Sequence, residues 1–168
     1  MADVRAARLE EFALLGAIEG QAGVRFLELG LSLETPVPVA ERGEVPLAAF
    51  VAGDPPVGFA WVNLVCGEPH LEELAVLPSA GRRGLGRALV EGVCAWAKDA
   101  DYRSVTLCAF RDVPWNGPFY LSAGFVELSP DRWCPELASI RATERANGLD
   151  GAGARVVMIR YLRQARTT

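Results

Sequence analysis

The sequence predicts an α+β fold with a mixed, mostly antiparallel central sheet, and two patterns support this class. Two apolar runs, Leu47–Ala52 and Val57–Val65, flank a Gly-Asp-Pro-Pro turn, which is typical of a β-hairpin. Further on, the strand-like run Leu71–Leu77 precedes a helical pattern at Gly84–Lys98 and a second strand-like run at Ser104–Phe110. A strand, a helix of this length and another strand indicate a parallel crossover, whereas the hairpin indicates antiparallel pairing. Both features in one chain predict a mixed sheet.

The N-terminal third of the chain is predicted to add one strand and two helices. Val4–Arg5 could begin the first strand of the sheet. Apolar residues recur at helical spacing in Glu10–Glu19 and again in Ala22–Leu31, which predicts two short helices. The stretch Glu34–Pro46 is rich in proline and charge and predicts a loop.

The C-terminal third is predicted to contain two helices and two strands. A short helix at Pro118–Ala123 ends at Gly124, because glycine commonly stops a helix. A strand is expected at Phe125–Leu128, and a charged helix at Pro135–Asn147. The apolar run Arg155–Leu162 predicts the last strand.

Length and composition limit the function. The 168 residues fit a single domain over residues 1–168, and the formal net charge of −4 argues against nucleic acid as the main partner. No apolar run is long enough to span a membrane, and the N-terminus lacks the apolar core of a secretory signal, so we expect a cytoplasmic protein without a membrane partner. The four cysteines form no CxxC pair, so reduced thiols and no metal site are expected for Cys66, Cys94, Cys108 and Cys134.

The turn between Leu71–Leu77 and the following helix carries the main chemical signal. Gly84 and Gly86 remove side chains where backbone must approach a ligand, and the first N–H groups of the helix have no partner within it. Three arginines surround them, namely Arg82, Arg83 and Arg87. This is the chemistry that a pyrophosphate needs, although a plain turn on a basic surface is the alternative. A Walker loop would need Gly-Lys-Ser/Thr, and a dinucleotide fingerprint a third glycine.

The segment LEELAVLPSAGRRGLGRALVEG resembles the acetyl-CoA-binding motif of the GNAT superfamily of N-acetyltransferases. The resemblance implies a GNAT-like fold with a β-α-β core that binds acetyl-CoA as co-substrate. One position departs from the family motif, because Gly81 stands where the family has Arg or Gln. By resemblance, the pantetheine arm would bond to the backbone of Leu74, Ala75 and Val76. The pyrophosphate would lie against Arg82, Arg83, Gly84, Leu85, Gly86 and Arg87.

A second signature follows downstream. The pattern Tyr120-x-x-x-Gly124-Phe125 resembles the late family motif, in which the tyrosine lies near the cofactor sulfur. The resemblance implies that Tyr120 is the general acid that protonates the departing thiolate of coenzyme A, a role open to a phenol that is neutral at pH 7. Packing against the helix is the alternative. Asn116 could contact the cofactor or cap the next helix.

An acceptor amine is protonated at neutral pH and must lose a proton before it attacks. The family often places a base on the strand before the glycine turn, four and six positions before the valine. His70 and Glu72 stand at these positions here and share one face of the strand. They are the candidate bases, with a surface role as the alternative, and Glu73 is a lesser candidate because a bulge would exchange the faces.

These features predict an acetyl-CoA-dependent N-acetyltransferase that moves the acetyl group directly to a primary amine of a small molecule or peptide. The alternative is a catalytically idle acyl-CoA sensor or interaction module on the same fold. The N-terminal helices and the Glu34–Pro46 loop would lie over the acceptor but carry no motif that names it. A homodimer is left open.

Overall fold

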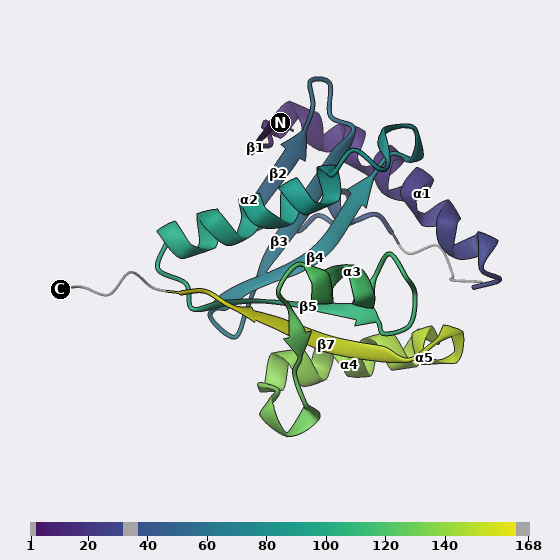
Figure 1. Cartoon of the computed structure of the whole chain (residues 1–168), viewed down its shortest axis with the longest axis vertical. Helices are drawn as coiled ribbons and strands as arrows, with labels where there is room; N and C mark the ends of the chain where they lie inside the picture. The colour runs from purple at the N-terminus through teal and green to yellow at the C-terminus, as the bar shows by residue number, and fades with distance from the viewer. Residues whose placement is uncertain (1–2, 32–36, 164–168) are drawn as a thin grey trace. The chain divides into compact units, whose positions relative to one another are not determined.

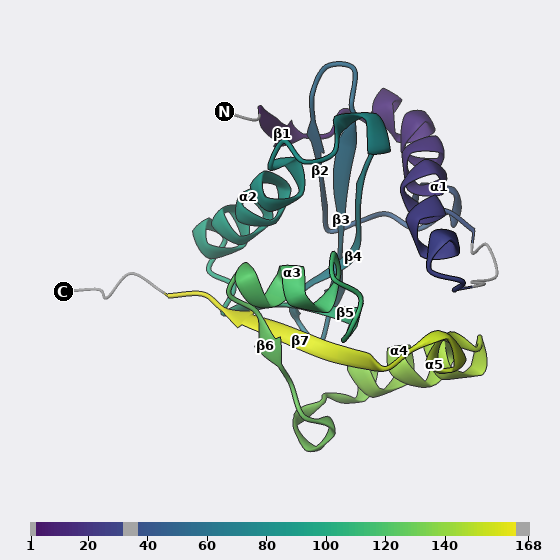
Figure 2. The ribbon, with the colours of Figure 1, turned by 45° about the vertical axis from the view of Figure 1, so that its right-hand side comes forward.

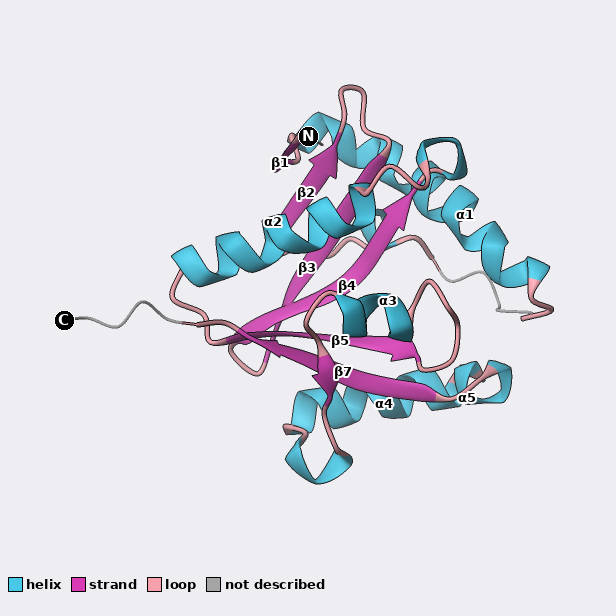
Figure 3. Ribbon diagram, viewed as in Figure 1, coloured by secondary structure: helices cyan, strands magenta, loops and turns pink. Residues whose placement is uncertain are grey.

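A computed structural model describes residues 3–31 and 37–163 of the chain. The strands pair in the order β1-β2-β3-β4-β5-β7-β6, within a fold that also contains helices (Figures 1 and 3). The predicted α+β class with a mixed, mostly antiparallel sheet is confirmed, since β4 and β5 run parallel while the β1–β2, β2–β3, β5–β7 and β6–β7 pairs run antiparallel. No helix in the described ranges has both the length and the apolar character needed to cross a membrane.

The chain divides into two compact units that interleave along the sequence. The first comprises Met1–Asn63 and Leu71–Val93, and the second comprises Leu64–His70 and Cys94–Thr168. Each is described separately below. The prediction of one domain over residues 1–168 stays a prediction.

Strands β1 to β4 form the sheet of the first unit. The predicted hairpin is present, with Val51 opposite Phe59, and β1 pairs with the outer edge of β2 through Arg5 and Val51. Apolar side chains of these strands, including Val51, Phe59 and Trp61, are fully buried, as expected for strands covered on both faces. The bounds are Val4–Ala6 for β1, Ala48–Ala52 for β2, Gly58–Val65 for β3 and Glu68–Val76 for β4.

Helices α1 and the first part of α2 cover opposite faces of this sheet, as Figure 2 shows. Leu15 and Ile18 of α1 pack against Phe59 and Trp61 on one face. On the other face, Leu89 of α2 (Leu85–Asp99) lies so close to Gly58 that a Cβ there would be 3.3 Å from its methyl group. Apolar burial on both faces therefore holds β4 and the turn after it in place.

The prediction of two N-terminal helices was wrong, because α1 runs without a break from Phe12 to Glu28. The 3₁₀ turn Leu9–Glu11 precedes it. The predicted helices were separated at Gly20, but an interior glycine costs a helix only about 1 kcal/mol relative to alanine. The buried stripe that includes Leu15 and Ile18 offsets that cost.

The predicted loop Glu34–Pro46 lies partly outside the described residues, which resume at Val37. Its described part contains a 3₁₀ turn at Val39–Glu41, and the Val39 side chain is buried against α1. The Val39 N–H donates a 2.9 Å hydrogen bond to Glu19 Oε2. This bond ties the segment to α1.

The second unit is built on β5 and β7, which pair over seven residues from Ser104–Tyr161 to Phe110–Arg155. Helices α3 and α4 lie on opposite sides of these strands (Figure 2). The second unit's elements are β5 at Ser104–Phe110, α3 at Gly117–Ser122, β6 at Val126–Glu127, α4 at Pro135–Ala146, α5 at Leu149–Ala152 and β7 at Arg155–Tyr161. The predicted elements are present with small shifts of their ends, and the short α5 is additional.

The expectation of reduced thiols was wrong for two of the four cysteines. Cys66 lies in the two-residue turn between β3 and β4, where it and Gly67 have φ values of +54° and +76°. A disulfide joins Cys66 to Cys134, the residue before α4, and both lie in the second unit. Cys94 and Cys108 are not part of this disulfide. Sequence spacing could not show the pair because 68 positions separate its members. A cytoplasmic location stays a prediction.

Candidate active site

The turn that follows β4 has the backbone shape expected of an anion site. A 3₁₀ turn at Pro78–Ala80 ends at Gly81, after which Arg82 and Gly84 have left-handed φ values of +61° and +75°. Left-handed residues alternating with ordinary ones turn successive N–H groups toward one side, as in known anion-binding nests. Gly84 suits this turn because glycine adopts positive φ without a steric penalty.

The start of α2 adds donors and charge to the turn. The Ala88 N–H bonds to the Gly84 carbonyl at 3.0 Å, so the N–H groups before it lie ahead of the first intrahelical bond. Arg82, Arg83 and Arg87 all have exposed side chains. The structure thus brings together the predicted group from Arg82 to Arg87, and its donors and charge fit a pyrophosphate.

The end of β4 offers backbone groups beside this turn. Within the first unit β4 is the last strand, with β3 on one side, and the Leu77 N–H continues that pairing to the Val57 carbonyl at 2.8 Å. On the other edge of β4, the parallel pair with β5 lies at His70, four residues before Leu74. An unpaired strand edge can bind an extended ligand through main-chain hydrogen bonds.

A group of charged side chains lies on the first unit, contributed by α1, the segment after Val39–Glu41, and β4. Its members are Glu19, Arg42, Glu72 and Glu73, and we call it the carboxylate group. Arg42 Nη1 forms a 3.1 Å ion pair with Glu72 Oε1. Glu19 and Glu72 both act electrostatically on Glu73. Three carboxylates around one guanidinium leave a net negative charge there.

Glu73 is the member of the carboxylate group whose protonation is most altered. Burial of its carboxyl, followed by the charges of Glu19 and Glu72, raises its pKa to about 8, against the opposing effects of Arg42 and the Leu74 N–H. The pKa of Glu19 is also raised, mainly by burial. A carboxylate with a pKa near neutrality accepts protons far better than an ordinary one, and such groups concentrate at functional sites.

Glu72, one of the two preferred candidates, has a different environment. Its side chain is one-quarter exposed and paired with Arg42. The ion pair with this guanidinium holds the Glu72 carboxylate in a fixed position. The structure therefore gives Glu72 a positioning partner and gives Glu73 the environment of a base.

His70, the other preferred candidate, is a buried residue of the second unit, with 2% of its surface exposed. Its Nδ1 lies 2.8 Å from the hydroxyl oxygen of Thr106. These two residues also lie opposite each other where β4 and β5 pair in parallel. The bond satisfies a polar ring in the core, as buried polar groups require.

Tyr120 lies on α3 in the second unit and is 7% exposed. Its ring packs at 5.1 Å from Phe119 and 5.7 Å from Phe125, in edge-to-face contacts. The Phe125 N–H donates to the Tyr120 carbonyl at 3.0 Å, and Gly124 between them has a φ of +89°. The Tyr-x-x-x-Gly-Phe pattern is therefore a helix stop that fixes the tyrosine against an aromatic neighbour.

Asn116 holds the loop before α3. Its Oδ1 accepts a 2.5 Å hydrogen bond from the Phe110 N–H at the end of β5, and it makes no side-chain cap to the helix. The next residue, Gly117, is packed so closely that a Cβ would lie 2.5 Å from the Arg111 carbonyl oxygen. The helix-cap alternative for Asn116 was wrong, and a contact with the cofactor stays a prediction.

Two members of the carboxylate group, Glu19 and Arg42, were missed as site residues by the sequence reasoning. Glu19 is one of two acidic residues on α1, and Arg42 lies in a segment without a motif. A helical plot could place Glu19 one residue beyond the buried Ile18, but its distance from β4 depends on tertiary packing. Among the described residues, no cluster of His, Cys, Asp and Glu has the makings of a metal site.

The site therefore combines a β-α-β core, a turn with left-handed residues at the start of α2, and a strand on which the pKa of Glu73 is raised. Residues 45–127 match the sequence model of the acetyltransferase (GNAT) domain. This region of the chain belongs to the GNAT acetyltransferase family. The matched region takes in the hairpin, the glycine turn and Tyr120.

Solved structures of the same fold are numerous. The ribosomal-protein-S18-alanine N-acetyltransferase of Escherichia coli is 20% identical, with a TM-score of 0.68 over 100% of this chain and 98% of that one. A GNAT-family acetyltransferase of Staphylococcus aureus Mu50 is 13% identical, with a TM-score of 0.72 over 97% of this chain and 100% of that one. The PaiA N-acetyltransferase of Thermoplasma acidophilum, solved with coenzyme A, is 13% identical, with a TM-score of 0.68 over 96% of this chain and 99% of that one. At these identities the likeness shows the fold.

Proposed function

We propose that this protein transfers the acetyl group of acetyl-CoA directly to a primary amine of a small molecule or peptide. The observation that carries the proposal is the first unit's segment from β4 to α2. It combines Glu73, whose pKa is raised to about 8, with the left-handed turn at Arg82–Gly84. A proton acceptor and a phosphate site on one continuous strand, turn and helix are what acetyl transfer to an amine requires.

Acetyl-CoA fits the residues present. Its pyrophosphate would bind the N–H groups at the start of α2 and the exposed guanidinium groups of Arg82, Arg83 and Arg87. The pantetheine arm would bond to the backbone of Leu74–Val76, and Asn116 is kept as a further contact. The coenzyme A complex of the Thermoplasma relative supports this choice of ligand.

Glu73 is the base in this proposal. Its carboxylate takes a proton from the acceptor ammonium, the amine nitrogen attacks the thioester carbonyl carbon, and the carbon–sulfur bond then breaks. We rank Glu73 above Glu72, which Arg42 engages, and above His70, which is buried against Thr106. The net negative charge of the carboxylate group also favours a cationic acceptor.

Tyr120 is proposed as the acid that protonates the departing thiolate. The packing of its ring between Phe119 and Phe125 restricts its rotamers, which supports a directional role for the hydroxyl. The GNAT-type spacing of Tyr120 from the glycine turn is the second support. No enzyme-bound acetyl intermediate is required.

Two assays on the purified protein test the function. Acetyl-CoA should raise the melting temperature in a titration, since a ligand that binds only the folded state stabilises it. A panel of amines with acetyl-CoA should then release a free thiol at a rate that depends on the amine. Stabilisation without turnover would favour the idle sensor, and the absence of both would refute acetyl-CoA binding altogether.

A further inference from the structure

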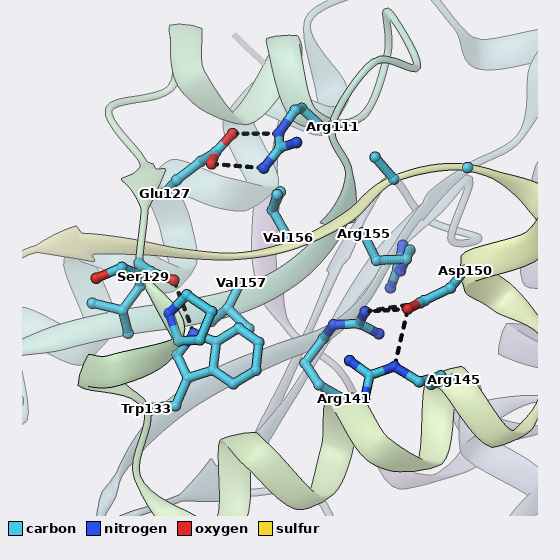
Figure 4. Close-up of a pocket in the computed structure, with 14 residues that line it drawn as sticks. Arg111, Glu127, Ser129, Trp133, Arg141, Arg145, Asp150, Arg155, Val156 and Val157 are labelled. Atoms are coloured by element: carbon cyan, nitrogen blue, oxygen red, sulfur yellow. Dashed lines mark hydrogen bonds and ion pairs between the residues drawn. The ribbon is translucent and has the colours of Figure 1, made fainter.

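The second unit contains a cavity that none of the predicted site residues lines. Its volume is about 560 Å³, and its walls come from β6, α4, α5 and the start of β7 (Figure 4). Small-molecule sites in proteins range from about 300 to 1,000 Å³. The cavity is therefore large enough for a ligand of its own.

One side of the cavity is apolar and held in a fixed geometry. The indole of Trp133 lies beside Val157 in Figure 4, and Leu128 also lines the cavity. Trp133 Nε1 donates a 2.8 Å hydrogen bond to the Leu128 carbonyl oxygen, which fixes the orientation of the ring. A fixed aromatic plane next to aliphatic side chains is suited to a flat or branched apolar group.

The opposite side carries charge. Arg141, which is 3% exposed, pairs with Glu144 at 2.8 Å and with both carboxylate oxygens of Asp150 at 2.8 and 3.0 Å. Glu144 also holds Arg155, and Asp150 also holds Arg145. Two carboxylates thus serve three guanidinium groups, which leaves one positive charge in excess.

Arg141 retains an unused donor. Among the described residues its Nε, which is buried, has no hydrogen-bond partner, although its other two nitrogens do. Buried polar groups in folded proteins nearly always find a partner. The Arg141 guanidinium therefore keeps its positive charge at the cavity wall with one donor unsatisfied.

Arg145 is the most accessible of the three arginines. Its side chain is 66% exposed, and its Nε lies 3.3 Å from Asp150 Oδ2, a long and weak contact. Figure 4 shows Arg145 and Arg141 converging on Asp150 at the end of α4. An incoming anion can therefore engage Arg145 without breaking a strong ion pair.

We propose that this cavity binds a small amphipathic carboxylate. Its apolar body would lie against Trp133 and Val157, and its carboxylate would accept hydrogen bonds from Arg145 and Arg141. The excess positive charge disfavours a cation, and a bare inorganic anion would leave the apolar wall uncovered. This site goes beyond acetyl transfer and does not depend on it.

Titration by NMR with benzoate, benzamide and inorganic phosphate tests the proposal. The Trp133 indole N–H signal, assigned by its loss in Trp133→Phe, should shift saturably with benzoate at a Kd of about 1 mM or below. Benzamide has the same shape without the charge, and phosphate has the charge without the ring. Both should bind at least about tenfold more weakly. Equal binding of benzamide or phosphate, or no saturable shift with benzoate, would overturn the proposal.

Matched variants locate the binding. Arg145→Ala should weaken benzoate binding at least about tenfold, because it removes the accessible guanidinium without opening the core. Arg103→Ala removes an exposed arginine of the same unit outside the cavity and should leave the Kd unchanged. Unfolding temperatures show that both variants are folded. An unchanged Kd in Arg145→Ala, or an equal loss in Arg103→Ala, would contradict the site.

Discussion

At the scale of single residues, two neighbouring carboxyls of β4 lie in different environments, and this difference underlies the choice of Glu73 as the proposed base. Glu72 and Glu73 are neighbours in sequence, yet Arg42 pairs with the first, and burial with two like charges raises the pKa of the second to about 8. Like charges and lost hydration both disfavour the ionised form of a carboxyl. This contrast leads to two predictions about Glu73.

Replacing the base should abolish most turnover. We expect Glu73→Gln to lower kcat by about 10²- to 10⁴-fold, because removal of a general base typically costs that much. The affinity for acetyl-CoA, measured by calorimetry, should change little. Glu28→Gln, an exposed position at the end of α1, is the control and should keep wild-type kcat. A larger loss in Glu72→Gln than in Glu73→Gln would transfer the role to Glu72.

The pH dependence of kcat should report the same carboxyl. Because the pKa is raised, Glu73 is protonated and inactive below about pH 8 and becomes a competent base above it. The rate should therefore rise about tenfold per pH unit on the acid side and level off above about pH 8. This rise of kcat with pH should be absent from the residual activity of Glu73→Gln. If the same rise persisted in that variant, another group would be responsible for it.

Removing the phenol hydroxyl should separate chemistry from binding. Tyr120→Phe keeps the ring contacts with Phe119 and Phe125 and deletes only the proton donor. We expect kcat to fall by about 10²-fold, with the acetyl-CoA affinity nearly unchanged. Steady-state kinetics and calorimetry measure the two effects. Parallel losses of kcat and affinity would indicate a packing role.

At the scale of elements, the turn between β4 and α2 depends on its left-handed residues. Gly84 has a φ of +75°, and no atom lies within 4 Å of where its Cβ would be. Space is therefore available for a side chain, and the backbone conformation alone requires glycine. The orientation of the N–H groups at the helix start follows from that conformation.

A matched pair of glycine variants tests the role of the turn. Gly43 has a φ of +74° and equally open surroundings outside the turn. Gly84→Ala and Gly43→Ala should each destabilise the fold by about 1 kcal/mol. Only Gly84→Ala should also weaken acetyl-CoA binding, by about tenfold or more, because it redirects the phosphate-binding N–H groups. Equal affinities of the two variants would show that the turn does not bind the ligand.

At the scale of the whole molecule, the chain has few covalent constraints beyond its own backbone. The disulfide Cys66–Cys134 joins the turn between β3 and β4 to the start of α4 within the second unit. The Cys66 N–H also donates to Glu136 Oε2 at 2.9 Å, so the two segments are held together by a hydrogen bond as well. The effect of the disulfide on stability should be measurable.

Reduction should lower stability without abolishing the fold. Closing a loop over a separation of 68 residues contributes up to about 4 kcal/mol in the chain-entropy view of disulfides. We expect dithiothreitol to lower the melting temperature of the wild type, and Cys134→Ser to melt at the reduced value with or without reductant. Mass spectrometry with thiol labelling counts the free cysteines. Four labelled cysteines in the untreated protein would show that the bond does not form.

Much of the fold was predictable because its determinants are local. Alternation and turn residues placed the hairpin, and the Pro–Gly pattern placed the turn before α2. The break expected near Gly20 failed because burial of Leu15 and Ile18 sustains α1 across it. Phe125 was expected in a strand, but it is a core residue just ahead of β6. Packing across the sheet decided each of these cases, and it is not encoded in a short window of sequence.

By itself, the sequence determined the α+β class, the glycine turn and the identity of the residues that could bind a phosphate or move a proton. Only the tertiary structure distinguished Glu73 from Glu72 and His70, because a pKa depends on charges and burial contributed by other elements, here Glu19 of α1 and Arg42. The pairing of Cys66 with Cys134 and the arginine-lined cavity have the same origin. Each depends on residues that are distant in sequence and meet only when the elements pack.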